Sequence, residues 1–164
     1  MRIIVGLVQD AWIALVADLG ILPELHGQNS LIELDESFYP KRVIHRDFQS
    51  IYSDQQIRDS FGLPCFEKHI AGLEEGTTVS SQYSLVYDGM IGRFLFDRLV
   101  EAFCNHYDYS VENVQYAIKK RFLAFSDNYS GKFPDTIYSF DRHASEQEGN
   151  DIGLKDTGEC PPYR

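Results

Sequence analysis

Apolar side chains recur at intervals of three and four residues between Leu85 and Tyr107. The apolar positions with this spacing are Ile91, Phe94, Leu95, Leu99, Ala102 and Phe103. This spacing places them on one face of an α-helix, and the helix would be the longest in the chain. A second stripe, formed by Val114, Ile118, Phe122 and Phe125, follows Ser110, whose hydroxyl can cap another helix. Helices pack together through such apolar faces, so the sequence predicts a largely helical core.

Two short β-strands interrupt this helical pattern near the start of the chain. An apolar helix is predicted from Met1 to about Leu22, and Gly20 and Pro23 end it. Leu31–Leu34 and Arg42–Arg46 then have the composition of strands, joined by the polar turn around Ser37. A short helix through Phe61 would follow, with Ser53 and Gln56 as its capping box. The prediction is an α+β fold, mostly helical, with a small antiparallel hairpin at one edge.

The 164 residues correspond to one domain, large enough to bury a core without a metal or disulfide. We expect this domain to span residues 1–142, because the composition becomes polar after Arg142. Residues 143–164 are expected to form a loose, flexible tail. A chain that begins with an apolar helix, of the kind that usually packs against another layer, can also be the back half of a longer protein.

The charge of the chain excludes several classes of partner. A formal net charge of -10 argues against binding to nucleic acid or to acidic membranes. Polar residues at Gln9, Asp10 and Asp18 interrupt the first apolar stretch, so a membrane span is not expected.

The three cysteines form no CxxC pair, which indicates neither a disulfide framework nor a zinc site and favours a cytoplasmic location.

Polar residues stand just before the first strand of the predicted hairpin and at the end of the second. Glu24, His26, Gln28 and Asn29 precede the first strand, and Arg46 and Asp47 follow the second. In an antiparallel hairpin the start of one strand lies opposite the end of the other, so the two groups should meet.

The carboxylate and amide oxygens among these side chains are suitable ligands for Mg²⁺ beside phosphate groups. His26 and Arg46 could stabilise developing charge. A polar loop held by its own hydrogen bonds is the alternative interpretation. A protein kinase is a weaker one, since no glycine-rich phosphate loop is present.

The motifs Glu24-x-His26-Gly27-Gln28-Asn29 and Arg46-Asp47-Phe48 resemble the C-terminal domain of siderophore synthetases of the aerobactin-synthetase type. The resemblance implies an ATP-dependent ligase of iron acquisition, with a palm-like domain. It would activate a citrate-like carboxylate as an acyl-adenylate for condensation with an amine or hydroxyl. ATP and Mg²⁺ would be its cofactors, and an N-terminal half would be needed for activity.

By position in the motifs, the resemblance assigns roles to six side chains. Glu24, Gln28 and Asp47 would bind the metal, Gln28 and Asn29 the nucleotide, and His26 and Arg46 would be catalytic.

Two other functions stay open from the sequence. The first is a non-catalytic nucleotide-binding or assembly module from a truncated or split gene. The second is a ferric-siderophore reductase with an iron–sulfur cluster, which usually needs four thiolates where this chain has three cysteines. The substrates and the oligomeric state, including a homodimer, are not fixed by the sequence.

Overall fold

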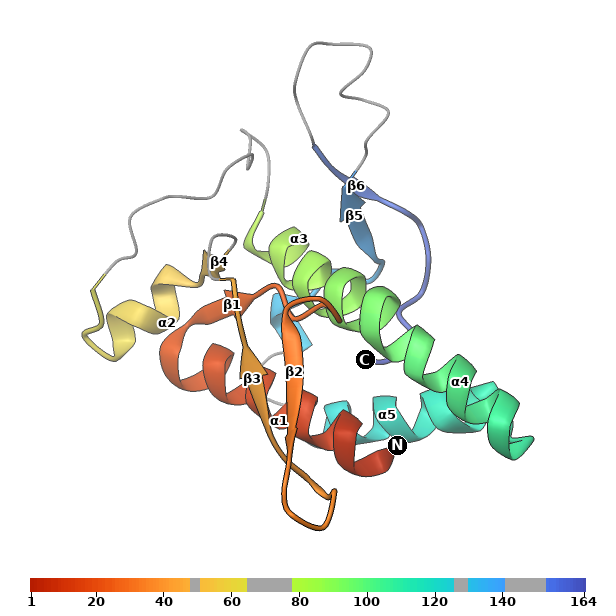
Figure 1. Ribbon diagram of the computed structural model, residues 1–164. Coiled ribbons are helices and arrows are strands. Elements are labelled where there is room, and N and C mark those ends of the chain that lie inside the picture. Colours follow the sequence, from red (N-terminus) through yellow and green to blue (C-terminus); the bar gives the residue numbers. More distant parts are fainter. Residues whose placement is uncertain (48–50, 65–77, 126–129, 141–152) are drawn as a thin grey trace.

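The computed structural model has the predicted α+β fold, with packed helices and three two-stranded antiparallel sheets in the described residues (Figure 1). The structure describes residues 1–47, 51–64, 78–125, 130–140 and 153–164. Phe48, Cys65 and the first part of the predicted tail, residues 143–152, lie outside these ranges. No helix in the described ranges is long and apolar enough to cross a membrane.

Helix α1 (Arg2–Leu19) confirms the predicted first helix and supplies one wall of the core. It ends at Gly20, which adopts the left-handed conformation with φ 60°. The chain then forms β1 (Ile21–Pro23), which pairs with β4 (Ile51–Ser53). The amide of Asp54 donates to the carbonyl of Gly20 at 2.9 Å and extends this pairing. β1 precedes the predicted hairpin and β4 follows it, so their pairing holds both ends of the hairpin segment next to α1.

The predicted hairpin is confirmed by β2 (Ser30–Leu34) and β3 (Pro40–His45). Their antiparallel register pairs Ser30 with His45 and continues to Leu34 opposite Pro40. In Figure 1 the hairpin crosses α1, which β3 contacts, and only its tip, with the exposed side chain of Phe38, extends past the helix. Its open end faces the opposite way, toward the helical body.

Residues 79–107 form one continuous helical rod, in agreement with the predicted long helix. The rod consists of α3 (Val79–Ser84), the π-helical segment η1 (Leu85–Phe96) and α4 (Asp97–Tyr107). A π-helix has more residues per turn than an α-helix, so its side chains drift out of the 3.6-residue phase. Phe94 is therefore 62% exposed, although the α-helical spacing predicted that it would be buried.

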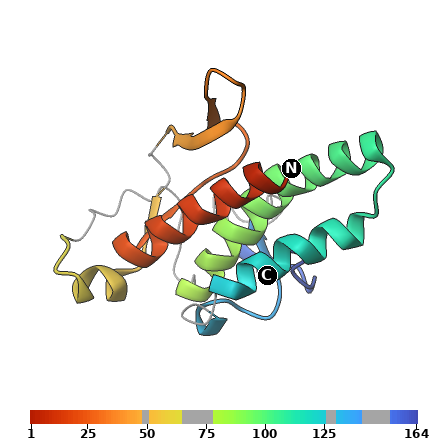
Figure 2. The same ribbon diagram turned by 90° about the horizontal axis from the view of Figure 1, so that it is seen from below.

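The core lies between α1, the rod and α5 (Val111–Phe125), whose start is capped by Ser110 as predicted. Trp12 of α1 is fully buried at its centre. Its ring contacts the rings of Tyr87, Phe122 and Phe133, with centroids 5.0, 6.3 and 6.0 Å away. In Figure 2 the rod runs between α1 and α5, which flank it.

Two details differ from the sequence prediction at the next helix. Helix α2 (Gln55–Ser60) is capped by Asp54, which accepts from the amide of Ile57, and not by Ser53. Ser53 instead ends β4, because its backbone is used in the pairing with Ile21. The Asp54 carboxylate is buried, and it also accepts from the hydroxyl of Tyr83 at 2.8 Å.

The last described segment is packed against the core, which differs from the loose tail predicted for this part of the chain. After η3 (Ser130–Lys132), strand β5 (Tyr138–Phe140) pairs with β6 (Leu154–Asp156). Tyr163 is 1% exposed and packs edge to face on Phe96. Few residues make this contact, so the polar composition of the segment as a whole concealed it.

Candidate functional site

The open end of the hairpin brings the two predicted polar groups together. The amide of Arg46 donates to the carbonyl of Asn29 at 3.0 Å, which continues the strand pairing by one residue. The Nε–H of Arg46 donates to the carbonyl of Gln28, also at 3.0 Å. These bonds fix the loop of residues 24–29 against the end of β3.

The ring of His26 contacts two other residues of the loop. Its Nδ1 accepts from the amide of Gln28 at 3.3 Å, and its Nε2 lies 3.1 Å from the side-chain amide of Asn29. The direction of the contact with Asn29 depends on which ring nitrogen carries the proton. Both ring nitrogens therefore have partners inside the loop, which supports a structural role for this histidine.

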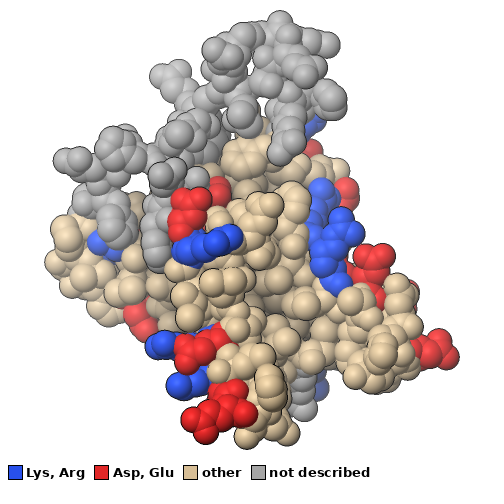
Figure 3. Space-filling model, viewed as in Figure 1, with Lys and Arg blue, Asp and Glu red and all other residues tan. Residues whose placement is uncertain are grey.

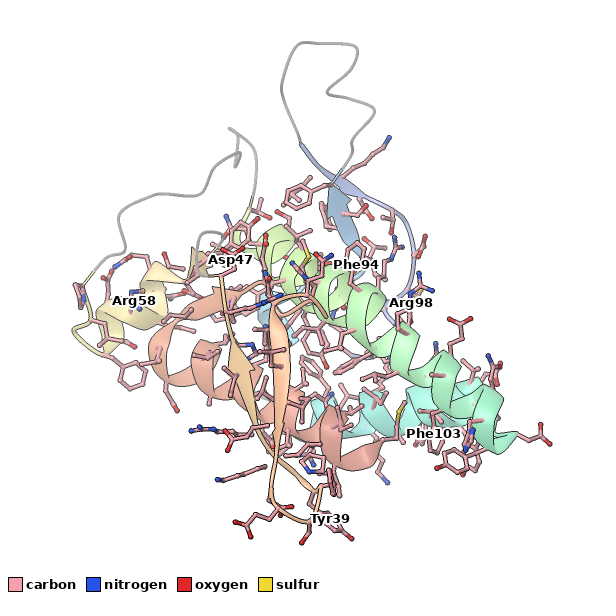
Figure 4. The ribbon with its side chains drawn as sticks, in the orientation of Figure 1. Tyr39, Asp47, Arg58, Phe94, Arg98 and Phe103 are labelled. Atoms are coloured by element: carbon pink, nitrogen blue, oxygen red, sulfur yellow. The ribbon has the colours of Figure 1, made fainter. Side chains whose placement is uncertain are left out.

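Glu24 and Asp47 are the acidic members of the site. Burial raises the pKa of the Glu24 carboxyl, and the nearby charge of Asp47 raises it further. Asp47 follows β3 with φ 64°, a backbone conformation that is costly for a residue with a side chain. Glu24, which follows β1, and Asp47, which follows β3, are thus close enough to interact electrostatically. Asp47 is labelled in Figure 4.

The rod borders the site on the side opposite the β1–β4 sheet. A Cβ atom placed on Gly27 would lie 3.6 Å from the carbonyl oxygen of Phe94, so the loop lies directly against η1. Figure 4 shows Phe94 and Arg98 on the near side of the rod. The charged side chains of this face form separate small groups, with uncharged surface between them (Figure 3).

His45 adjoins the site but was not among the predicted site residues. It stands opposite Ser30 at the last pair of the β2–β3 register. Both of its ring nitrogens are buried, and neither has a hydrogen-bond partner in the described part of the chain. Burial lowers the pKa of this imidazole, so it is neutral near pH 7. The signal that could have identified it is its register position directly opposite the polar loop.

The site does not form a rich cluster of metal ligands. Within the described ranges, no group of three or more His, Cys, Asp and Glu side chains could hold a metal ion. Glu24 and Asp47 supply two carboxylates, and the remaining predicted ligand, Gln28, is exposed. The geometry is that of a polar loop with one half-buried acid, Glu24.

A comparison with family models gives one match. The model described as "Ferric iron reductase FhuF-like transporter" matches residues 3–114, which is more than half of the chain. The chain belongs to this family. The match contains nearly all of α1, the polar loop, the hairpin and the whole helical rod. Comparison with curated proteins and with solved structures gives no significant match.

Membership of the FhuF-like family overturns the resemblance to siderophore synthetases. The predictions of an ATP-dependent ligase, of acyl-adenylate formation and of ATP and Mg²⁺ as cofactors are therefore wrong. The error has a physical reason. Two short motifs determine that a polar loop meets a strand end, but many oxygen-rich ligands can be bound by the same side chains. Arg46 contacts Gln28 and Asn29, so the two motifs meet, whereas the roles of the six residues stay predictions.

The raised pKa of Glu24 gives a prediction for stability. An acid whose pKa is raised by folding stabilises the protein fully below its unfolded pKa, and this contribution is lost as the pH rises through the folded pKa. We expect Glu24→Gln to melt a few degrees above the wild type at pH 8, with the difference vanishing toward pH 4.

Thermal unfolding followed by circular dichroism checks this expectation. Glu36→Gln is the control, since this exposed carboxylate lies in the hairpin turn. A Glu24→Gln variant less stable than the wild type at pH 8 would show that the charged carboxylate has a stabilising partner.

Proposed function

We propose that this chain binds a ferric siderophore and takes part in the one-electron reduction of its iron. The observation that carries the proposal is the FhuF-like match, because it contains the whole polar site. Reduction converts Fe(III) to Fe(II), which oxygen ligands hold less tightly, so the metal can leave the chelate. No covalent bond to the protein is needed in this reaction.

The polar loop has features that suit the periphery of such a chelate. A siderophore surrounds its iron with oxygen donors, so a protein contacts the outside of the complex and not the metal. Arg46 is exposed and uses its Nε–H for the carbonyl of Gln28, and a guanidinium has five donors in all. The backbone oxygen of Phe94 lies against the loop at Gly27, and the residue is 62% exposed, so its ring is open to a ligand. Arg46 would bind chelate oxygens, and Phe94 would contact the apolar parts.

The cysteines of the chain do not fit an iron–sulfur cluster. The sequence has three, and a cluster usually takes four thiolates. Cys104 is buried in α4, while Cys160 is exposed in the last segment. We therefore propose that the electron comes from a separate donor, a reduced flavin or an iron–sulfur protein. Both described cysteines are free, in accord with a location in the reducing cytoplasm, which is part of the proposal.

Binding and reduction can be measured separately. Equilibrium dialysis against ferric complexes of a trihydroxamate, a tricatecholate and citrate tests binding for three chelate chemistries. Reduction is followed by the absorbance of a ferrous-iron trap, with reduced flavin as donor and the rate without protein subtracted. We expect saturable binding of at least one chelate and a faster reduction of that chelate.

Arg46→Ala is the variant that tests the site. Loss of a charged hydrogen bond is worth ~1.5–3 kcal/mol, so the affinity for the chelate should fall by about tenfold or more. Arg42→Ala is the matched control, because Arg42 is exposed on β3, which ends just before Arg46, and pairs with Glu33. Equal affinities of the two variants would remove the loop from the binding site. Failure of all three chelates to bind would refute the function itself.

A further inference from the structure

A cavity of about 650 Å³ lies at the end of the helical body away from the β1–β4 sheet. It is formed where the first turn of α1 meets α4 and α5, and both ribbon views show these segments side by side (Figures 1 and 2). Its apolar wall includes Val5, Phe103, Val114, Ile118 and Phe125. None of the residues of the polar loop contributes to it.

The polar groups of the cavity are neutral or cationic. Asn113, Lys120 and Arg121 are its most polar members, and no aspartate or glutamate is among its lining residues. This is unusual in a chain with a net charge of -10. An anion would therefore meet a local field opposite to that of the protein as a whole.

The two cations of the cavity have different surroundings. Arg121 donates to both carboxylate oxygens of Asp10, at 2.6 and 2.8 Å, and its guanidinium lies 5.5 Å from the ring centre of Phe125. Arg121 is thereby held as part of the wall. Lys120 is exposed and has no ion pair in the described part of the chain. Its ammonium group is thus available to a ligand.

We propose that this cavity binds a small amphipathic anion, with an aliphatic or aromatic body among the apolar side chains and its carboxylate or sulfonate at Lys120. The volume falls in the range of ~300–1,000 Å³ that is typical of small-molecule sites. Such sites combine a mainly apolar lining with a few polar groups that orient the ligand. Phe125 remains 44% exposed at the edge, so a ligand would cover apolar surface that is now in contact with water.

The probe for this site is 8-anilinonaphthalene-1-sulfonate, whose fluorescence rises in an apolar environment. We expect one saturable site per chain, and displacement of the probe by decanoate but much less by the uncharged decanol. Lys120→Glu should weaken binding of the probe by about tenfold. Lys119→Glu makes the same change of charge at the neighbouring residue, which does not line the cavity, and should leave the affinity unchanged.

A second variant tests the cavity itself. Ala117 lines it and is exposed, so Ala117→Trp can fill the space without disturbing the core, and it should abolish binding while the melting temperature stays the same. Equal loss of affinity in Lys120→Glu and Lys119→Glu would overturn the proposal. So would a concentration-dependent dimer in sedimentation that Ala117→Trp dissociates, because the groove would then be an interface between two copies.

Discussion

Replacing Arg164 by methionine should lower the free energy of unfolding by ~3–5 kcal/mol, the usual cost of removing one partner of a buried ion pair. The Nε of Arg164 lies 2.9 Å from both carboxylate oxygens of Asp88. Their side chains are 9% and 1% exposed, so water cannot replace the lost guanidinium. Arg164 also lies over the ring of Phe133, at 4.6 Å from its centre. Urea unfolding at pH 7 measures the loss.

Asp88 explains why the loss should be so large. Burial raises the pKa of its carboxyl, while Arg164 and the hydroxyl of Ser84 act in the opposite direction. Without Arg164, the buried acid must either stay charged without its main partner or take up a proton. The double variant Asp88→Leu with Arg164→Met should recover much of the stability, because it removes both charges.

The control for this pair is Arg98→Met, which changes an arginine whose side chain is 80% exposed. It should cost less than ~1 kcal/mol, as expected for a surface ion pair. If Arg164→Met were no more costly than this control, the last segment would not be fixed to the core by its ion pair.

Local sequence patterns predicted the parts of the fold that local forces determine. The predicted stripe gave α5 because side chains three and four residues apart share one helical face, and Val114, Ile118 and Phe122 are buried, although its last member, Phe125, is 44% exposed. The alternation and turn chemistry of residues 31–46 gave the hairpin. The approach of Arg46 to Gln28 followed directly, since antiparallel pairing leaves no other place for the residue after the strand.

The remaining features depend on contacts between distant residues. The pairing of β1 with β4 involves only three residues on each side, too few to produce a periodic pattern. The burial of Tyr163 depends on its fit against Phe96, which no local pattern encodes. The exposure of Phe94 arises from the π-helical segment, whose turns differ from the assumed 3.6-residue spacing.

The chemistry of the site was the least predictable feature, for a related reason. Glutamate, glutamine, asparagine and arginine side chains bind phosphates, metal ions and siderophore oxygens through the same donors and acceptors. The spacing of Glu24, Gln28 and Asp47 determined where they lie but not which ligand they bind. Two motifs of a few residues therefore do not identify the ligand.

Gly20→Ala should be the second most damaging change, with a loss of ~2–4 kcal/mol in the free energy of unfolding from backbone strain and overpacking together. The φ of 60° at Gly20 already disfavours a side chain. In addition, a Cβ atom would lie 2.7 Å from Cγ of Arg58 and 2.8 Å from the backbone oxygen of Asp54. The backbone oxygen cannot move without breaking the junction between α1, β4 and α2.

Gly62→Ala separates the two contributions, because Gly62 has nearly the same φ, 64°, but nothing within 4 Å of its added Cβ. This control measures strain alone and should cost ~1 kcal/mol. The excess loss in Gly20→Ala therefore reports the crowding at the junction. Since the same junction positions Glu24 and its loop, Gly20→Ala should also weaken ferric-chelate binding, whereas Gly62→Ala should not. Equal losses of stability in the two variants would mean that the backbone near Asp54 shifts freely to accept a methyl group.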